Sequence, residues 1–416
     1  MPFLKASFFL PFTMNKLAVL IPFFLLLAMS EWWLTRNSRP GQFTKENTLL
    51  NICIGAIDRI LSLASFSLFI FVLKLVYDNF RLFTPEITWY HWVLAYIAVD
   101  FVSYWYHRFS HRIAILWCGH VTHHSSDHFN LTNGFRTSPL QGLNRIPFWI
   151  ILPILGFPPA VLLTVFLISG LYDFFLHTQS FPKVRWLELV FITPSLHKVH
   201  HGKNDVYIDK NYGSTFVIWD KLFGTFQDET EPVSYGILSA DYRDGDPVDA
   251  IFHHYKYLWM LMSRSVSWKN KLKVLIMPPD WVPDDLRDKE VHSETVLLSE
   301  SGRQRVVYAV ALFAASGTGI ISLLIFQAET SLMAFCMYAG FFLTAMITAT
   351  RILNRRSGAR VRRNEILRNL FFVTLFGTAF LFPGAKESQL LYGLALSFVF
   401  AVWSLNLGEA VHATAD

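Results

Sequence analysis

Eight apolar stretches, most of them as long as a membrane-crossing helix, constrain this chain more than any other feature. A helix needs roughly 20 residues to cross about 30 Å of hydrocarbon. The composition agrees, because 53% of the 416 residues are hydrophobic and only 16% are charged, against about 25% in a typical soluble domain. The sequence therefore predicts an all-α integral membrane protein built as a multi-span helical bundle. The stretches are Leu17–Leu34, Leu50–Val76, Tyr90–Tyr106, Ile146–Leu176, Val306–Phe326, Ser331–Thr350, Ile366–Phe382 and Leu390–Leu407.

The first stretch is either a cleaved signal peptide or a retained span. Lys5 and Lys16 flank separate apolar pieces, and Trp32 and Trp33 stand where an interfacial anchor would stand. Because tryptophan gathers at membrane interfaces and a signal peptide has a single short apolar core, we favour a retained span.

Basic residues between the stretches indicate which side of the membrane each loop occupies. The linker Arg351–Arg368 contains seven arginines and one acidic residue, Glu365. Short loops with this bias stay in the cytoplasm. Counting back through the two preceding stretches places the polar central region, about Phe181–Arg305, in the cytoplasm as well, and the basic loop Arg36–Lys45 agrees. We interpret the net charge of +5 as membrane topology and not as nucleic-acid binding.

The fourth stretch is divided by a helix-breaking segment. Its arms, Ile146–Leu155 and Val161–Leu176, flank Gly156–Pro159. Proline cannot continue a helix and disfavours helical geometry in the residue before it, and each arm is short for a full crossing. We expect a re-entrant helical hairpin that enters from the cytoplasmic side and returns there. It would either line a channel for an alkyl chain or serve only as an anchor.

Eight of the fifteen histidines form three boxes with short, regular spacing. Positions i, i+3 and i+4 share one face of a helix, so each box aims its imidazoles at one spot. Imidazole is the commonest neutral ligand for first-row metals, and eight ligands exceed what one ion needs. The spacing therefore predicts two metal ions in a cytoplasmic, histidine-rich helical cap. The boxes are His107 and His111; His120, His123 and His124; and His197, His200 and His201.

The other seven histidines lie outside the three boxes. His177 ends the second hairpin arm, one turn after Asp173, and is either a ninth ligand or a structural residue at the membrane interface. A single histidine is usually a core or surface residue, so we do not expect the rest to bind metal. They are His91, His128, His253, His254, His292 and His412.

The chemistry expected of such a site is oxidative. Metal-bound histidines need their other ring nitrogen held by a carboxylate or a carbonyl. The boxes lie beside lipid, where attack on an unactivated C–H bond requires a redox metal, which favours iron; zinc would bind the same ligands but cannot cycle electrons. The candidate carboxylates are Asp127, Asp173, Asp205, Asp209 and Asp220.

The electrons for such a reaction have to come from outside the chain. The three scattered cysteines, Cys53, Cys118 and Cys336, exclude a disulfide scaffold, a zinc finger and a cysteine-ligated iron–sulfur cluster. The sequence also contains no haem-binding segment and no GxGxxG motif. An oxygenase of this sequence therefore needs a pterin or a separate electron carrier as reductant.

The boxes and their order between the spans resemble the fatty acid hydroxylase/sterol desaturase superfamily of membrane di-iron enzymes. Within it, the chain is most similar to the alkylglycerol monooxygenases and their bacterial relatives, strongly over about Tyr90–Gly236. The three boxes mark the superfamily, and the segments DKNYG and WDKLFGTF mark this branch. The residues that carry the resemblance are Trp117–Ser126, Asn130–Thr132, His177–Thr178, Thr193–Asn204, Ile208–Gly213 and Ile218–Phe226.

The resemblance implies that the eight box histidines hold two irons, activate O2 and hydroxylate a membrane lipid. In alkylglycerol monooxygenases the carbon next to the ether oxygen is hydroxylated, the hemiacetal splits into an aldehyde and glycerol, and tetrahydrobiopterin supplies the electrons. The chain departs from this pattern at Arg112, where relatives carry Glu directly after the first box. It also reads Asp127-His-Phe-Asn130 and Phe135-Arg-Thr-Ser138 where relatives read EDYN and LRQS.

The sequence thus divides into N-terminal transmembrane spans (1–89), a di-iron catalytic domain (90–240), a cytoplasmic amphipathic connector (241–305) and C-terminal transmembrane helices (306–416). The leading function is a di-iron lipid monooxygenase. A fatty acyl or sterol hydroxylase or desaturase with another electron donor is the alternative. A metal transporter is a third reading, but transporters carry ionisable residues along a path within the spans, whereas these histidines lie at a membrane edge.

Overall fold

The computed structural model describes residues 20–238, 242, 245–286, 303–327, 330–354, 359–379 and 387–405. In this part of the chain the regular structure is helical, with only two isolated β-bridges, which confirms the all-α prediction. The longer helices are α2 (Leu20–Thr35), α3 (Lys45–Phe80), α4 (Trp89–Arg112), α9 (Pro159–Leu176), α12 (Pro247–Arg264), α14 (Arg303–Ile325), α15 (Leu332–Leu353), α16 (Ala359–Ala379) and α17 (Glu387–Leu405). The shorter helices are α5 (Ala114–Cys118), α6 (Val121–His124), η3 (Leu131–Phe135), α7 (Gln141–Trp149), α8 (Ile151–Ile154), η4 (Leu187–Leu189), α10 (Pro194–His200), α11 (Ile218–Leu222), α13 (Trp268–Ile276) and η5 (Asp284–Leu286).

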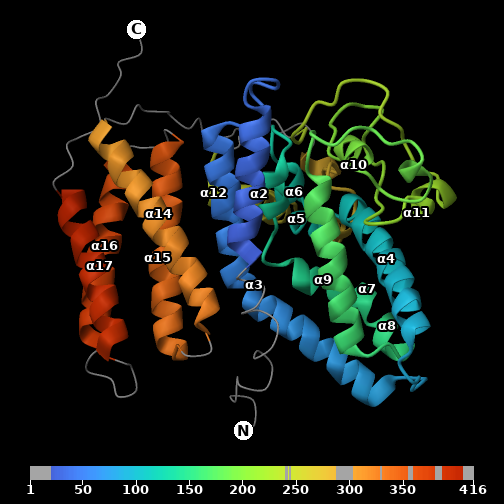
Figure 1. Ribbon diagram of the computed structural model, residues 1–416, viewed down its shortest axis with the longest axis horizontal. Coiled ribbons are helices and arrows are strands. Elements are labelled where there is room, and N and C mark those ends of the chain that lie inside the picture. The colour runs from blue at the N-terminus through green and yellow to red at the C-terminus, as the bar shows by residue number, and fades with distance from the viewer. Residues whose placement is uncertain are drawn as a thin grey trace.

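Four of the described helices, α3, α9, α14 and α15, are long and apolar enough to cross a membrane. They confirm a multi-pass membrane protein. The expected spans at α4 and α16 are helical but fall outside this group, and α2 and the Tyr392–Leu405 part of α17 are shorter apolar helices. The crossing of these four therefore stays a prediction. The 36 residues of α3 correspond to about 54 Å, more than the hydrocarbon thickness, and Figure 1 shows its C-terminal part sloping beneath α9, α7 and α8.

The divided stretch forms the expected helix–turn–helix. Its first arm is broken once more, at Ile150 between α7 and α8, and its second arm is α9 with Pro159 in the first turn. Gly156 makes the turn with a φ of +92°, and a Cβ at this position would lie 2.5 Å from the carbonyl oxygen of Phe83. Only glycine fits this turn. Because α9 alone is long and apolar enough to cross a membrane, both the re-entrance of the hairpin and the side from which it enters stay predictions.

The hairpin packs on α3 and α4 through an apolar cluster. Phe69 of α3 meets Trp149 of the first arm edge to face, and Trp149 meets Phe166 of the second arm in the same way. Val99 of α4 and Val165 of α9 complete the buried side of this contact. The packing joins the N-terminal halves of α4 and α9, whose C-terminal ends both lead into the histidine region.

The C-terminal helices join the rest of the chain through α15 and α12. The helices α14 to α17 stand side by side at one flank in Figure 1, and a large apolar cluster connects α14 and α15 to α3. Arg351 of α15 binds Asp246, which caps the N-terminus of α12. The carbonyl of Ala250 in α12 accepts a hydrogen bond from Thr122, beside the second histidine box. The connector therefore braces the histidine region against the C-terminal bundle.

Candidate metal centre

The structure brings nine histidines together in two adjacent groups, and His177 is the ninth. Within each group, one ligand atom from every ring lies within 4.8 Å of all the others. The rings of His124 and His201, one from each group, stack with centroids 4.4 Å apart. The first group is His107, His111, His120, His124 and His200, and the second group is His123, His177, His197 and His201.

Each histidine comes from the end of a short or membrane-directed helix. The first box lies in the last turns of α4, and the second box spans the junction of α5 and α6. The third box lies on α10, which starts at Pro194 and is capped by the Thr193 hydroxyl. His177 is the C-cap residue of α9. Each group combines histidines from more than one box, so no box forms a group by itself.

The ring nitrogens are spaced as ligands of a common ion would be. Neighbouring Nε2 atoms lie 3.0–3.2 Å apart in five pairs. Two nitrogens bound at right angles to a metal at about 2.1 Å would be about 3.0 Å apart. The Nε2 atoms of His107 and His111 are buried and have no hydrogen-bond partner within the described residues.

The second ring nitrogens decide how these short contacts have to be interpreted. The Nδ1 of His123 lies 3.1 Å from the carbonyl oxygen of Arg136, and the Nδ1 of His177 lies 2.8 Å from that of Asp173. A carbonyl only accepts, so each ring carries its proton on Nδ1. Their Nε2 atoms, 3.2 Å apart, then present lone pairs to each other. This contact is repulsive unless a cation lies between them, so the pair fits metal ligands and not a hydrogen bond.

Protonation does not offer another explanation. Burial holds the pKa of His123, His197 and His201 well below the ordinary value for histidine, and the neighbouring rings lower it further. At neutral pH these rings are therefore neutral, with one nitrogen free to donate electrons. Neutral imidazole is the form that binds first-row metals, and the donor set suits iron, zinc, copper or nickel.

The DKNYG segment orients two rings of the first group through its backbone. The carbonyl of Lys210 accepts from the Nδ1 of His200 at 2.8 Å, and that of Tyr212 accepts from the Nδ1 of His107 at 2.9 Å. The intervening residue Asn211 has a φ of +54°, a left-handed conformation that asparagine tolerates better than most residues. Its side chain is fully buried and bonds to the main chain of residues 196 and 227.

Asp220, in the WDKLFGTF segment, holds the same loop through its carboxylate. Its carboxylate accepts hydrogen bonds from the amides of Tyr212 (2.7 Å) and Gly213 (2.8 Å) and from the hydroxyl of Thr225 (2.7 Å). Burial raises the pKa of Asp220 to about 6, so the group is ionised at neutral pH and its charge is stabilised by the three donors. The two segments that mark the family branch thus act together, one as the loop and the other as its support.

Arg112, the departure after the first box, has a counter-ion in the structure. Its guanidinium lies 3.1 Å from the carboxylate of Asp209. The other oxygen of Asp209 accepts from the hydroxyl of Tyr212 at 2.9 Å and lies 3.8 Å from the Nδ1 of His111. Asp209 therefore neutralises Arg112 and also lies near the Nδ1 of His111.

The remaining candidate carboxylates do not hold rings by their side chains. Asp173 supports His177 through its backbone carbonyl, while its carboxylate accepts from Ser214. Asp220 acts on the loop, as described above. No hydrogen bond or ion pair joins Asp127 or Asp205 to one of the nine rings in the described part of the chain.

Asp209→Asn tests this arrangement. Partners of metal-bound histidines typically contribute a factor of about 10–100 to metal affinity, and the long contact to His111 places the expected loss of iron affinity near the lower end, at about tenfold. The measurement is iron retained per chain during titration with a chelator. The exposed Asp205→Asn on the same segment is the matched control; equal retention in both variants would exclude a role for Asp209.

Three polar residues inside apolar helices support the histidine region and were not among the predicted site residues. Glu31 of α2 accepts from the amide of Leu131, and Asp100 of α4 accepts from that of Thr215, both at 2.8 Å. Asn51 of α3 accepts from Arg136 at 2.9 Å. Each of these residues anchors a loop of the histidine region to a helix. The sequence pattern that could have revealed them is a single polar residue within an apolar stretch.

That the isolated histidines bind no metal stays a prediction. His91, His128, His253 and His254 lie outside both groups. His91 bonds to the cap of α4, and His253 stacks on Tyr242. His292 and His412 lie outside the described residues.

Comparison with known proteins gives the family. The model of the fatty acid hydroxylase family matches residues 92–225. Human alkylglycerol monooxygenase is 32% identical over 396 residues, which cover 92% of this chain and 88% of the human protein. The alkylglycerol monooxygenase of Danio rerio is 35% identical over 266 residues, which cover 63% and 59% of the two chains.

A relative with a different name aligns with a smaller part of the chain. Ornithine lipid hydroxylase of Rhizobium tropici is 34% identical over 146 residues, 35% of this chain and 44% of that protein. No solved structure matches the chain. Given the near-complete alignment with the human protein, this chain belongs to the alkylglycerol monooxygenase family, within the fatty acid hydroxylase group of oxygen-dependent membrane oxidoreductases.

Proposed function

We propose that this chain hydroxylates an ether lipid at the carbon next to the ether oxygen, with two irons held by the nine histidines. One atom of O2 enters the product and the other leaves as water, while tetrahydrobiopterin supplies two electrons and two protons. The hemiacetal then splits into a fatty aldehyde and a glycerol. The observation that carries this proposal is the pair of adjacent all-histidine groups in a chain that aligns almost throughout with an alkylglycerol monooxygenase.

The protein's own contribution is to hold the ligands and to keep the centre dry. Iron bound there would supply the redox chemistry that an unactivated C–H bond requires. The backbone carbonyls described above fix which nitrogen faces inward in the rings of His107, His123, His177 and His200. The ring of Phe129 lies against His177, His197 and His201, and Tyr235 stacks on its other side at 5.3 Å. This apolar cover limits the access of water to the second group.

The centre is proposed to face the cytoplasm. Figure 1 places the α2–α3 connection at the same end of the molecule as α6 and α10. That connection, Arg36–Lys45, is basic, and the arginine-rich linker Arg351–Arg368 follows α15. Basic loops are retained on the cytoplasmic side, where a soluble reductant has access.

A second candidate function is hydroxylation of an acyl chain. It is favoured by the match of residues 92–225 to the fatty acid hydroxylase family model. The similarity of part of the chain to an ornithine lipid hydroxylase adds that a relative acts on a lipid other than an alkylglycerol. Both candidates need the same metal centre and differ in the carbon attacked, because an acyl chain gives a stable alcohol and an ether gives an aldehyde.

The test is an aerobic incubation of the purified protein with a lipid panel, with and without tetrahydrobiopterin, followed by mass spectrometry. We expect about two irons per chain and release of fatty aldehyde from alkylglycerol only when the pterin is present. An acyl ester of the same chain length is the matched substrate control. Oxygen insertion into the acyl lipid without aldehyde would support the second candidate, and one zinc with no iron would contradict both.

A further inference from the structure

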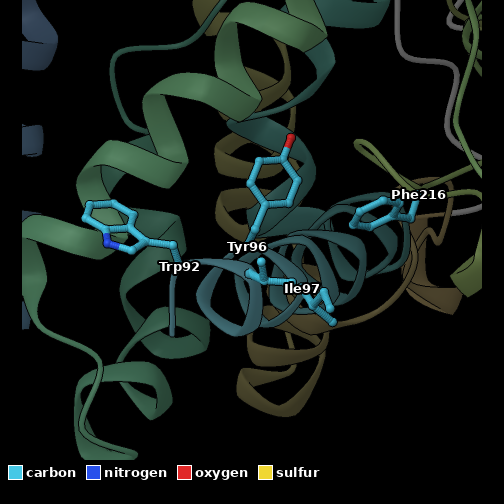
Figure 2. A pocket seen from close by; sticks show the side chains of 5 residues that line it. Trp92, Tyr96, Ile97 and Phe216 are labelled. Carbon is cyan, nitrogen blue, oxygen red and sulfur yellow. The ribbon is translucent and has the colours of Figure 1, made fainter. Parts of the chain in front are cut away.

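An apolar groove on α4 lies close to the metal centre and has no role so far. Its cavity volume is about 320 Å³, and Trp92, Val93, Tyr96, Ile97 and Phe216 line it with apolar surface only. Figure 2 shows the ring of Tyr96 standing between Trp92 and Phe216, with its hydroxyl turned away from Ile97. We call this cavity the α4 groove.

The groove opens towards the outside of the helix array. In Figure 1, α4 stands at the edge of the molecule, beyond α9. The side chains of Trp92 and Ile97 are each 39% exposed and that of Val93 is 50% exposed. In a multi-pass membrane protein, an exposed apolar face along a membrane-directed helix contacts lipid and not water. A hydrocarbon chain can therefore reach the groove directly from the bilayer.

One short loop separates the groove from the histidines. Phe216 lines the groove, and the preceding Thr215 bonds to the Tyr96 hydroxyl at 3.0 Å. At the other end of the same loop, the carbonyl of Tyr212 bonds to His107. Four residue steps span at most about 14 Å of extended chain, so the groove lies within that reach of the residue that supports the first group.

A second contact path runs to the second group. Ser214 of the loop donates to the carboxylate of Asp173 at 2.8 Å, and the carbonyl of Asp173 accepts from His177 at 2.8 Å. Ser214 also lies 3.1 Å from Ser169 of α9. The loop between the groove and the centre is thus polar, whereas the groove itself is apolar and borders lipid.

We propose that the α4 groove holds the alkyl chain of the substrate, so that the ether end of the lipid reaches past Tyr96 and Thr215 to the metals. The occupant is a long alkyl chain, because the lining offers no polar partner for a headgroup. An extended hexadecyl chain is longer than the span of at most about 14 Å between the groove and Tyr212. The chain can therefore lie in the groove while its ether carbon reaches the centre. This inference rests on the proposed function and adds the place where the chain length of the lipid is sensed.

The first test fills the groove. Ile97→Trp is expected to lower kcat/KM for hexadecylglycerol by about tenfold or more, since the size of an apolar pocket discriminates on this scale, and to leave octylglycerol nearly unchanged. Leu94→Trp is the matched control, because Leu94 is 51% exposed on the same helix but does not line the cavity. Equal losses for both chain lengths, or equal losses in both variants, would overturn the proposal.

The second test needs no turnover. An alkylglycerol with a photoreactive group at the end of its chain is crosslinked to the wild-type protein in phospholipid vesicles, and the labelled peptides are mapped. Labelling of Trp92–Ile97 that excess hexadecylglycerol removes supports the groove, even if no aldehyde is ever formed. Labelling that only phospholipid removes would show bulk bilayer lipid as the occupant and overturn the inference.

Discussion

His200→Ala is expected to abolish turnover and to remove metal from the first group. The Nε2 of His200 lies 3.1 Å from that of His124, and its Nδ1 is fixed by the carbonyl of Lys210. Alanine leaves four rings in this group and an unfilled position. Since partners outside the ligand shell already contribute a factor of about 10–100, loss of a ligand is expected to cost more than a hundredfold in activity. Iron per chain should fall with it.

The control for this prediction is His254→Ala. His254 is buried, with 8% exposure, and stacks on Tyr257, but it belongs to neither group. Both variants are purified in the same detergent and compared by helical content and elution volume. Loss of iron in both would indicate unfolding. Full activity in His200→Ala would remove the third box from the site.

The fold was largely predictable because its main signals are local. Apolar length indicates a span, and a Gly–Pro segment indicates a turn, without reference to any distant residue. The hairpin turn at Gly156 follows from such a pattern. The second break, at Ile150, was not predicted, although Pro147 and Pro153 flank it. Proline at position 153 cannot donate a hydrogen bond to the carbonyl of Trp149, which interrupts the helix at this point.

The ligand set was predictable for the same reason, and its support was not. Box spacing reveals which rings point together, so the eight histidines and the possible role of His177 could be read from the sequence. The expected partners were carboxylates or carbonyls, but only carboxylates could be named as candidates, and the structure uses the carbonyls of residues 136, 173, 210 and 212. Every residue has a carbonyl, so a backbone acceptor leaves no trace in residue identity.

The charge reversal at Arg112 shows a further limit of the sequence. The residue stands out as a cation where relatives carry an acid, which suggests a changed site. Its counter-ion, Asp209, lies in a distant segment and adopts a left-handed φ of +60°. Only the fold brings the two together, so the compensation becomes visible only in three dimensions.

Asp220→Ala is expected to have the second large effect, on stability and on the first group together. The side chain is fully buried and accepts three hydrogen bonds. Hydrogen bonds to a charged group contribute about 1.5–3 kcal/mol each, and buried donors left without an acceptor add to the loss. Three such bonds would amount to roughly 4.5–9 kcal/mol, but alanine also removes the cost of burying the carboxylate, which raises its pKa to about 6. We therefore expect roughly 3–5 kcal/mol of net destabilisation, within the range of the most damaging single substitutions.

The consequence for the metals follows from the loop that Asp220 supports. Without the carboxylate, the amides of Tyr212 and Gly213 lose their acceptor, and the Tyr212 carbonyl no longer holds His107 in place. The second group takes no support from this carbonyl, so about one iron per chain should remain where the wild type holds two. Thermal unfolding in detergent and iron analysis measure the two effects. An unchanged midpoint with both irons retained would show that the loop keeps its shape without Asp220.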